Sequence, residues 1–131
     1  MPVSKNVQIF LCLLGGHGAS LLPYSYGVLQ VYMYSYMYEY DSTLTMNQMH
    51  MHVPICFMVG SGFGWLQGLI KCVTPFFLHL INMTVICGCC LLMYWFCYSY
   101  MAVTISMVGI GLSYGMLHVY FISTAVNRVE G

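Results

Sequence analysis

Four apolar runs dominate the sequence, and each is long enough to cross a lipid bilayer as a helix. Crossing a hydrocarbon core of about 30 Å takes roughly 20 helical residues, and only a helix or a closed barrel satisfies its backbone groups without water. The sequence predicts an all-α membrane protein, a single unit over residues 1–131, with four transmembrane helices at about 7–31, 50–70, 75–97 and 101–124.

The charge content argues against an ordinary soluble domain. The chain is 60% hydrophobic and 5% charged, whereas soluble domains carry roughly 25% charged residues. Its three basic and three acidic residues cancel, so there is no basic surface to neutralise phosphates. We therefore expect a multi-pass integral membrane protein in contact with the lipid bilayer, and no nucleic-acid partner.

The few charges also predict an orientation. With four crossings, Lys5, Lys71 and Arg128 all fall on one side, and Glu39 and Asp41 fall in a loop on the other side. Because basic residues concentrate in cytoplasmic segments, we expect both termini in the cytoplasm.

A secretory signal is the alternative for the first run. Lys5 precedes the apolar stretch, and Gly18, Ala19 and Ser20 are small residues of the kind found at a cleavage site. The apolar pattern continues past them to Val31, which a signal peptide does not need. We expect the segment to stay as a helix.

Glycines recur inside the second and fourth runs, several of them four residues apart. In lipid, helices associate through close backbone approach at such small residues, and the same freedom suits transporter helices that rock past one another. The predicted helix-packing residues are Gly60, Gly64, Gly68, Gly109, Gly111 and Gly115.

Polar side chains surround Pro23 in the first run. A proline in mid-helix removes a backbone hydrogen bond and bends the helix, and polar groups within a span face a cavity or another helix. Hydrogen bonding between helices and the lining of a substrate cavity both stay open here. The candidate cavity residues are Tyr24, Tyr26, Gln30 and Tyr114.

Sulfur and imidazole groups raise the question of metals. Thioethers and imidazoles suit copper(I), which makes His50, His52, Met49 and Met51, with Met46 nearby, weak candidates for a copper site. An interfacial position explains them equally well, so no cofactor is expected. The cysteines lie in or beside apolar runs, which favours packing over disulfides; they are Cys12, Cys56, Cys72, Cys87, Cys89, Cys90 and Cys97.

No catalytic constellation can be assembled. All three acidic residues fall in loops or at the carboxyl-terminal end, and no serine, histidine and acid arrangement or paired intramembrane carboxylates are available. We do not expect an enzyme.

The first helix contains Pro23-Tyr-Ser-Tyr-Gly-Val-Leu-Gln-Val-Tyr32, the second ends with Gly64-Trp-Leu-Gln-Gly68, and the fourth contains Gly109-Ile-Gly-Leu-Ser-Tyr-Gly115. With these stretches the chain resembles the amino-terminal third of a major facilitator superfamily transporter, in its monocarboxylate and oxalate/formate antiporter-like branch. The resemblance implies alternating-access transport of small organic anions.

Two departures from that family matter. After Gly68 the family carries an Asp, Arg and Gly signature, whereas this chain reads Leu-Ile-Lys71-Cys-Val-Thr-Pro75. The family also has twelve helices, so we expect a transporter or a truncated transporter, completed by the missing helices, another copy or a partner membrane protein. The alternative is a non-transporting membrane interaction protein that docks through its glycine faces, and a copper-binding membrane protein ranks third.

Overall fold

The computed structural model describes residues 4–69 and 75–130, and these ranges are helical with no strand. The helices are α1 (Lys5–Tyr38), α2 (Met46–His50), α3 (His52–Phe63), α4 (Leu66–Leu69), α5 (Pro75–Trp95) and α6 (Tyr100–Glu130). Two of them are long and apolar enough to cross a membrane, over Phe76–Trp95 and Tyr100–Asn127.

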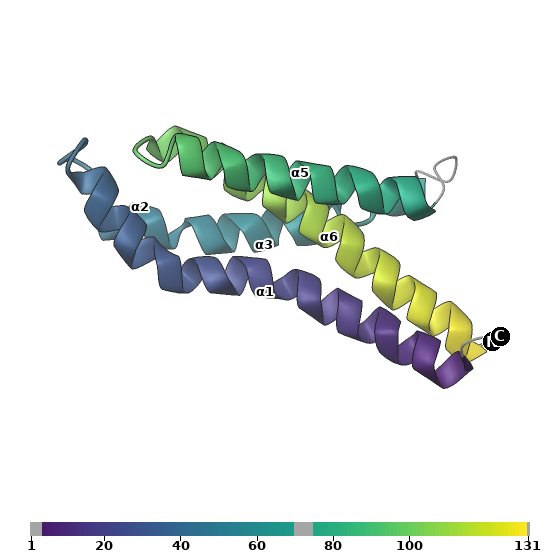
Figure 1. The fold of residues 1–131 in the computed structure, drawn as a ribbon. Helices are drawn as coiled ribbons and strands as arrows, with labels where there is room; N and C mark the ends of the chain where they lie inside the picture. Colours follow the sequence, from purple (N-terminus) through teal and green to yellow (C-terminus); the bar gives the residue numbers. More distant parts are fainter. Residues whose placement is uncertain (1–3, 70–74, 131) are drawn as a thin grey trace.

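Helix α6 is the centre of the fold. It packs along α1, α3 and α5, whereas α1 meets α2 and α3 over a smaller area. The start of α1 and the end of α6 lie together at one end of the molecule, as Figure 1 shows. The chain therefore runs an even number of times along the length of the bundle.

Helix α1 is the longest helix. The side chain of Ser4 accepts a hydrogen bond from the backbone N–H of Val7 at 3.4 Å and caps its first turn. The helix continues through Pro23 and is curved rather than straight (Figure 1). Its 34 residues extend about 51 Å at 1.5 Å per residue, well beyond the expected end at residue 31.

The expected single helix over 50–70 is broken at Met51, directly after α2, and again between α3 and α4. Pro54 lies in the first turn of α3 and has no N–H to donate to the carbonyl of His50, where α2 ends. The second interruption, at Gly64 and Trp65, begins at the last of three glycines in five residues, and glycines weaken a helix. The helix is therefore interrupted where a backbone hydrogen bond is missing and where helix propensity is low.

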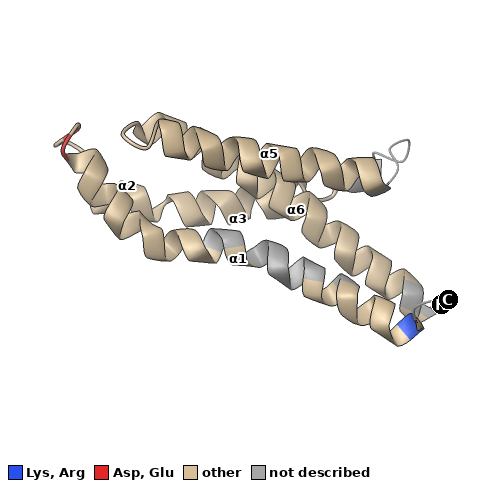
Figure 2. Cartoon of the chain, viewed as in Figure 1, with Lys and Arg blue, Asp and Glu red and all other residues tan. Residues whose placement is uncertain are grey.

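The described charges lie at the two ends of the molecule. Lys5 begins α1, at the end of the molecule where both chain ends lie, and Glu39 and Asp41 follow the other end of α1 (Figure 2). The hydroxyl and the backbone N–H of Thr43 donate to Asp41 Oδ1 at 2.6 and 3.0 Å and hold the pKa of that carboxyl below its usual value. Lys71 lies outside the described residues, as does the side chain of Arg128.

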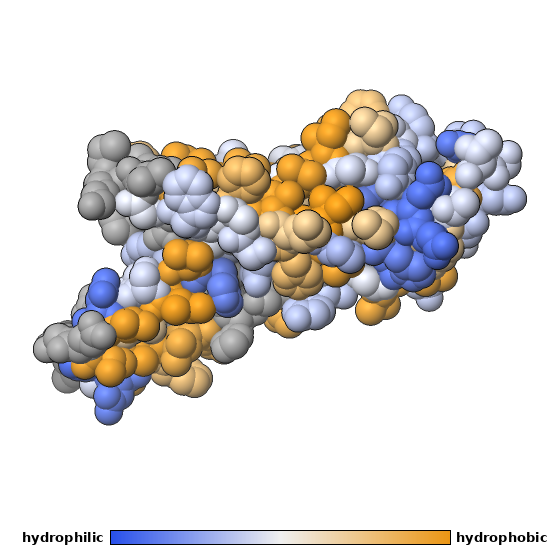
Figure 3. Space-filling view, turned by 180° about the vertical axis from the view of Figure 1, so that it is seen from behind, coloured by the Kyte–Doolittle hydropathy of each residue, from blue (hydrophilic) through white to orange (hydrophobic). Residues whose placement is uncertain are grey.

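Between the two ends the surface is rich in large apolar side chains. Met58 is 72% exposed, Phe76 is 70% exposed and Tyr94 is 77% exposed. Figure 3 shows hydrophobic residues over the middle of one face, with the larger hydrophilic group at the end away from the termini. The buried core lies toward that hydrophilic end and consists of Tyr26, Met37, Leu44, Met49, Cys56, Val103, Met107 and Ile110.

Glycines bring the backbones of α3 and α6 into contact. A Cβ on Gly111 would overlap the carbonyl oxygen of Cys56, one on Gly115 would overlap that of Gly60, and one on Gly64 would lie 2.9 Å from a methyl of Val119. Each pair is separated by 55 positions along the chain, so α3 and α6 run parallel and meet once per helical turn. Among the other predicted packing glycines, Gly109 faces Cys89 of α5, and Gly68 has open space around it.

The contact between α3 and α6 generates a test. Gly115→Ala places a methyl group against the Gly60 carbonyl and should lower the free energy of unfolding by about 1–3 kcal/mol, as overpacking does. Gly62→Ala is the matched control, because that position has open space and alanine favours the helix by about 0.5–1 kcal/mol. Denaturant unfolding in detergent micelles measures both. Equal stability of the two variants would contradict the close approach.

Candidate functional site

A chain of hydrogen bonds joins three helices in the interior. The Tyr26 hydroxyl of α1 lies 2.8 Å from His52 Nδ1 of α3, and His52 Nε2 lies 2.9 Å from Thr104 Oγ1 of α6. Tyr26 is 4% exposed and His52 is fully buried. Because an unpaired polar group in such a place is costly, each of these side chains depends on the others.

The direction of the hydrogen bonds assigns the histidine tautomer. Thr104 donates its hydroxyl proton to the carbonyl oxygen of Tyr100 at 2.9 Å, so toward His52 it can only accept. His52 Nε2 therefore carries the proton, and Nδ1 accepts from the Tyr26 hydroxyl. A second proton on this ring would take away the acceptor of Tyr26. The arrangement suits a neutral imidazole.

Aromatic rings enclose this histidine. The Tyr100 ring centroid lies 5.0 Å from that of His52, and the Tyr26 ring meets it edge-on at 5.7 Å. Nearer the surface, Gln30 Nε2 lies 2.9 Å from His50 Nδ1, while the buried Gln30 Oε1 has no hydrogen-bond partner among the described residues. The polar side chains of α1 thus meet α2 and α3 in two adjacent pairs.

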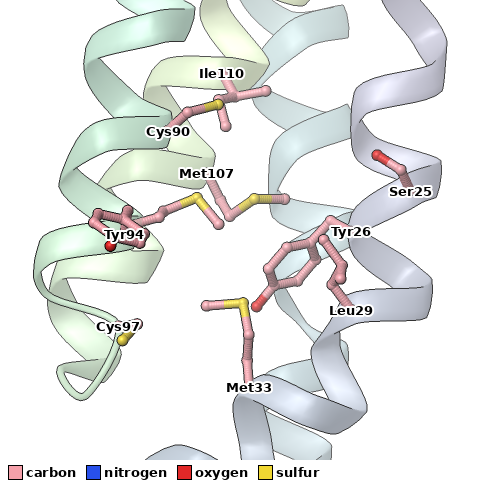
Figure 4. Close-up of a pocket in the computed structure, with 10 residues that line it drawn as sticks. Ser25, Tyr26, Leu29, Met33, Cys90, Tyr94, Cys97, Met107 and Ile110 are labelled. Carbon is pink, nitrogen blue, oxygen red and sulfur yellow. The ribbon is translucent and has the colours of Figure 1, made fainter.

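A cleft of about 400 Å³ lies between α1 and α5. Its floor is formed by buried residues of α1 and α6, namely Tyr26, Met107 and Ile110, and Tyr94 of α5 stands exposed at its rim. Figure 4 shows Tyr26 and Met33 of α1 facing the side chains of α5 and α6 across this space. The lining residues, none of them charged, are Ser25, Tyr26, Leu29, Met33, Cys90, Met93, Tyr94, Cys97, Met107 and Ile110.

The four candidate cavity residues do not share one cavity. Tyr26 alone lines the cleft, and it also belongs to the hydrogen-bond chain. Tyr24 and Tyr114 both pack against Phe57, with ring centroids 5.4 and 5.6 Å away, and Gln30 pairs with His50. Tyr26 therefore lines the cleft, whereas Tyr24 and Tyr114 pack against Phe57 outside its lining.

The candidate copper residues are also separated. His50 pairs with Gln30 and His52 with Tyr26 and Thr104. Met49 is fully buried, and Met51 is 53% exposed. Within the described residues, no group of three or more His, Cys, Asp or Glu side chains is placed to hold a metal ion.

Sequence reasoning missed most of the cleft, although a signal was present. Leu29 and Met33 follow Tyr26 at three and seven positions, and Met93 and Cys97 follow Cys90 at the same intervals. Residues three, four or seven apart share a helix face. The sequence therefore indicates one helix face in α1 and one in α5. That these two faces meet over α6 depends on the tertiary arrangement.

The hydrogen-bond chain generates a prediction about stability. Tyr26→Phe removes the donor to His52 Nδ1 and should lower the free energy of unfolding by about 1–3 kcal/mol, because a buried acceptor loses its partner. Tyr24→Phe is the control, since that ring is 64% exposed. In a His52→Leu background, Tyr26→Phe should have a much smaller effect. Additive losses in the two backgrounds would contradict the pairing.

Comparisons of the chain with protein-family models, with curated proteins and with solved structures found no match.

Proposed function

We propose that the chain is a multi-pass integral membrane protein that acts as a transporter of the major facilitator type, or as part of one. The membrane half of the proposal is supported by the exposed apolar side chains between two charged ends. In water, an exposed apolar surface of this extent is unfavourable by about 25 cal/mol per Å². Lipid removes that penalty.

Four crossings account for the helices. Helix α1 is long enough to span, α2, α3 and α4 together cover the second crossing, and α5 and α6 are the third and fourth. The interruptions in the second crossing fall where other helices lie alongside, the condition under which broken helices are tolerated in a membrane. Lys5 then lies on the cytoplasmic side, with both termini, and Glu39 and Asp41 lie on the other.

The cleft between α1 and α5 is the single observation that carries the transport half. It is lined by three segments of the chain and has a buried polar residue, Tyr26, at its floor. Transporters hold their substrates between helices near the middle of the membrane. Because Tyr26 also bonds His52, a molecule in the cleft would act directly on the contact between α1 and α3.

The cleft lining bears on the substrate. Among the described residues that line it, the hydroxyl groups are those of Ser25, Tyr26 and Tyr94, and none of these residues is cationic. The Tyr94 hydroxyl can donate to a carboxylate but cannot neutralise it, whereas Tyr26 already donates its one hydroxyl proton to His52. A small monocarboxylate would therefore need a basic residue from additional helices, from another copy or from a partner. On this proposal the chain supplies one wall of the substrate site.

A non-transporting interaction protein is the second candidate. It is favoured by α5, which packs mainly on α6 and exposes a row of apolar residues. It is weakened because Gly60, Gly64, Gly111 and Gly115 already serve the internal contact between α3 and α6. Docking through those glycines would require that contact to open.

Insertion and orientation can be tested in microsomal vesicles. The chain should resist extraction by alkaline carbonate. An epitope inserted after Ser42 should be protected from added protease, and one placed before Lys5 should be digested, because the two positions lie at opposite ends. Extraction by carbonate would refute the membrane assignment, and digestion of both epitopes would refute the orientation.

Transport can be tested in liposomes with labelled lactate as the probe. Leu29→Trp fills the cleft and should reduce lactate uptake at least about tenfold, whereas Val28→Trp, at a neighbouring exposed position outside the cleft lining, should leave uptake near the native level. Equal uptake in the two variants would remove the cleft from the transport path. No lactate uptake by the native chain would contradict transport of this anion by the chain alone.

A further inference from the structure

Sulfur atoms are concentrated in the cleft between α1 and α5. Sulfur-bearing residues make up about a seventh of the chain, with 12 methionines and 7 cysteines in 131 residues. They make up half of the ten residues that line the cleft, which is more than three times that frequency. The five are Met33, Cys90, Met93, Cys97 and Met107.

These side chains come from separate segments that meet at one place. Met33 belongs to α1, Cys90 and Met93 to α5, Cys97 to the turn after α5, and Met107 to α6. Met107 is 1% exposed and lies at the floor. Figure 4 shows the thioethers of Met33 and Met107 extending into the space between α1 and α5. The sulfur atoms therefore come from the α1 side and from the α5 side of one cleft.

We propose that this cleft binds a soft monovalent metal ion, copper(I) in a cell, through the three methionine thioethers and one of the two cysteine thiols. Thioether and thiolate ligands select copper(I), whereas Mg²⁺ and Ca²⁺ require oxygen ligands that the lining scarcely offers. This site is separate from the His50 and His52 region. The binding does not depend on whether the chain transports lactate.

The charge balance fits the apolar surroundings. When the ion binds, one thiol forms a sulfur–metal bond and releases its proton to solvent, so the thiolate neutralises the single positive charge. The thioethers bind without any proton change. The bound unit is therefore neutral, which is what a lining without charged side chains can hold. Cys97 lies in the turn between α5 and α6 and is half-buried.

The binding test uses the full chain in detergent micelles. Copper(I), kept reduced with ascorbate, is competed against a coloured copper(I) chelator. We expect one ion per chain, and we expect the double variant Met33→Leu/Met107→Leu to weaken binding at least about tenfold. Leucine matches methionine in volume and keeps the packing. The control is Met58→Leu/Met83→Leu, two exposed methionines outside the cleft, which should bind as the native chain does.

Thiol alkylation supplies a second readout. Copper(I) should protect Cys90 or Cys97 from N-ethylmaleimide, while Cys87, exposed on the same helix and outside the lining, should stay reactive. The protection should be lost in the Met33→Leu/Met107→Leu variant. If that variant does not fold, Met33→Leu alone, at a half-buried position, takes its place. Equal affinity in cleft and control variants, or protection of Cys87 to the same degree, would overturn the proposal.

Discussion

The contact between the backbones of α3 and α6 sets the arrangement of the other elements. Gly111 rests on Cys56 and Gly115 on Gly60, so the two helices are locked in a parallel register. His52 lies one helical turn before Cys56 in α3. In the same register it lies opposite Met107 of α6, one turn from Thr104. The hydrogen bond between His52 and Thr104 therefore depends on the absence of side chains one and two turns away. Small residues here determine where polar groups meet.

Hydropathy and residue spacing predicted the helices better than the contacts between them. The long apolar runs indicated helices, and helices occupy them. The break at Met51 was missed because Pro54 acts at a distance, on the carbonyl four residues earlier. Tyr26 and Tyr114 share residue type and surroundings in the sequence, yet one lines the cleft and the other packs on Phe57. Which face of a helix meets a partner depends on the neighbouring helices, and a single run carries no information about them.

Tyr26 has two roles that are physically linked. Its ring forms part of the floor of the cleft, and its hydroxyl donates to His52. A ligand that displaced this ring would also break the acceptor arrangement that fixes the neutral imidazole. The buried hydrogen-bond chain and the cleft therefore share Tyr26. A molecule bound in the cleft would alter the contact between α1 and α3, although α3 contributes no residue to the lining.

Helix α6 is the shared partner of α1, α3 and α5, and it is the last of the described helices in chain order. On a ribosome the three earlier helices emerge before the surface on which they pack exists. Until then the earlier helices have the smaller contacts of α1 with α2 and α3 and of α2 with α3. Packing of the described helices is thus postponed until α6 has been synthesised, and among them α1 waits longest.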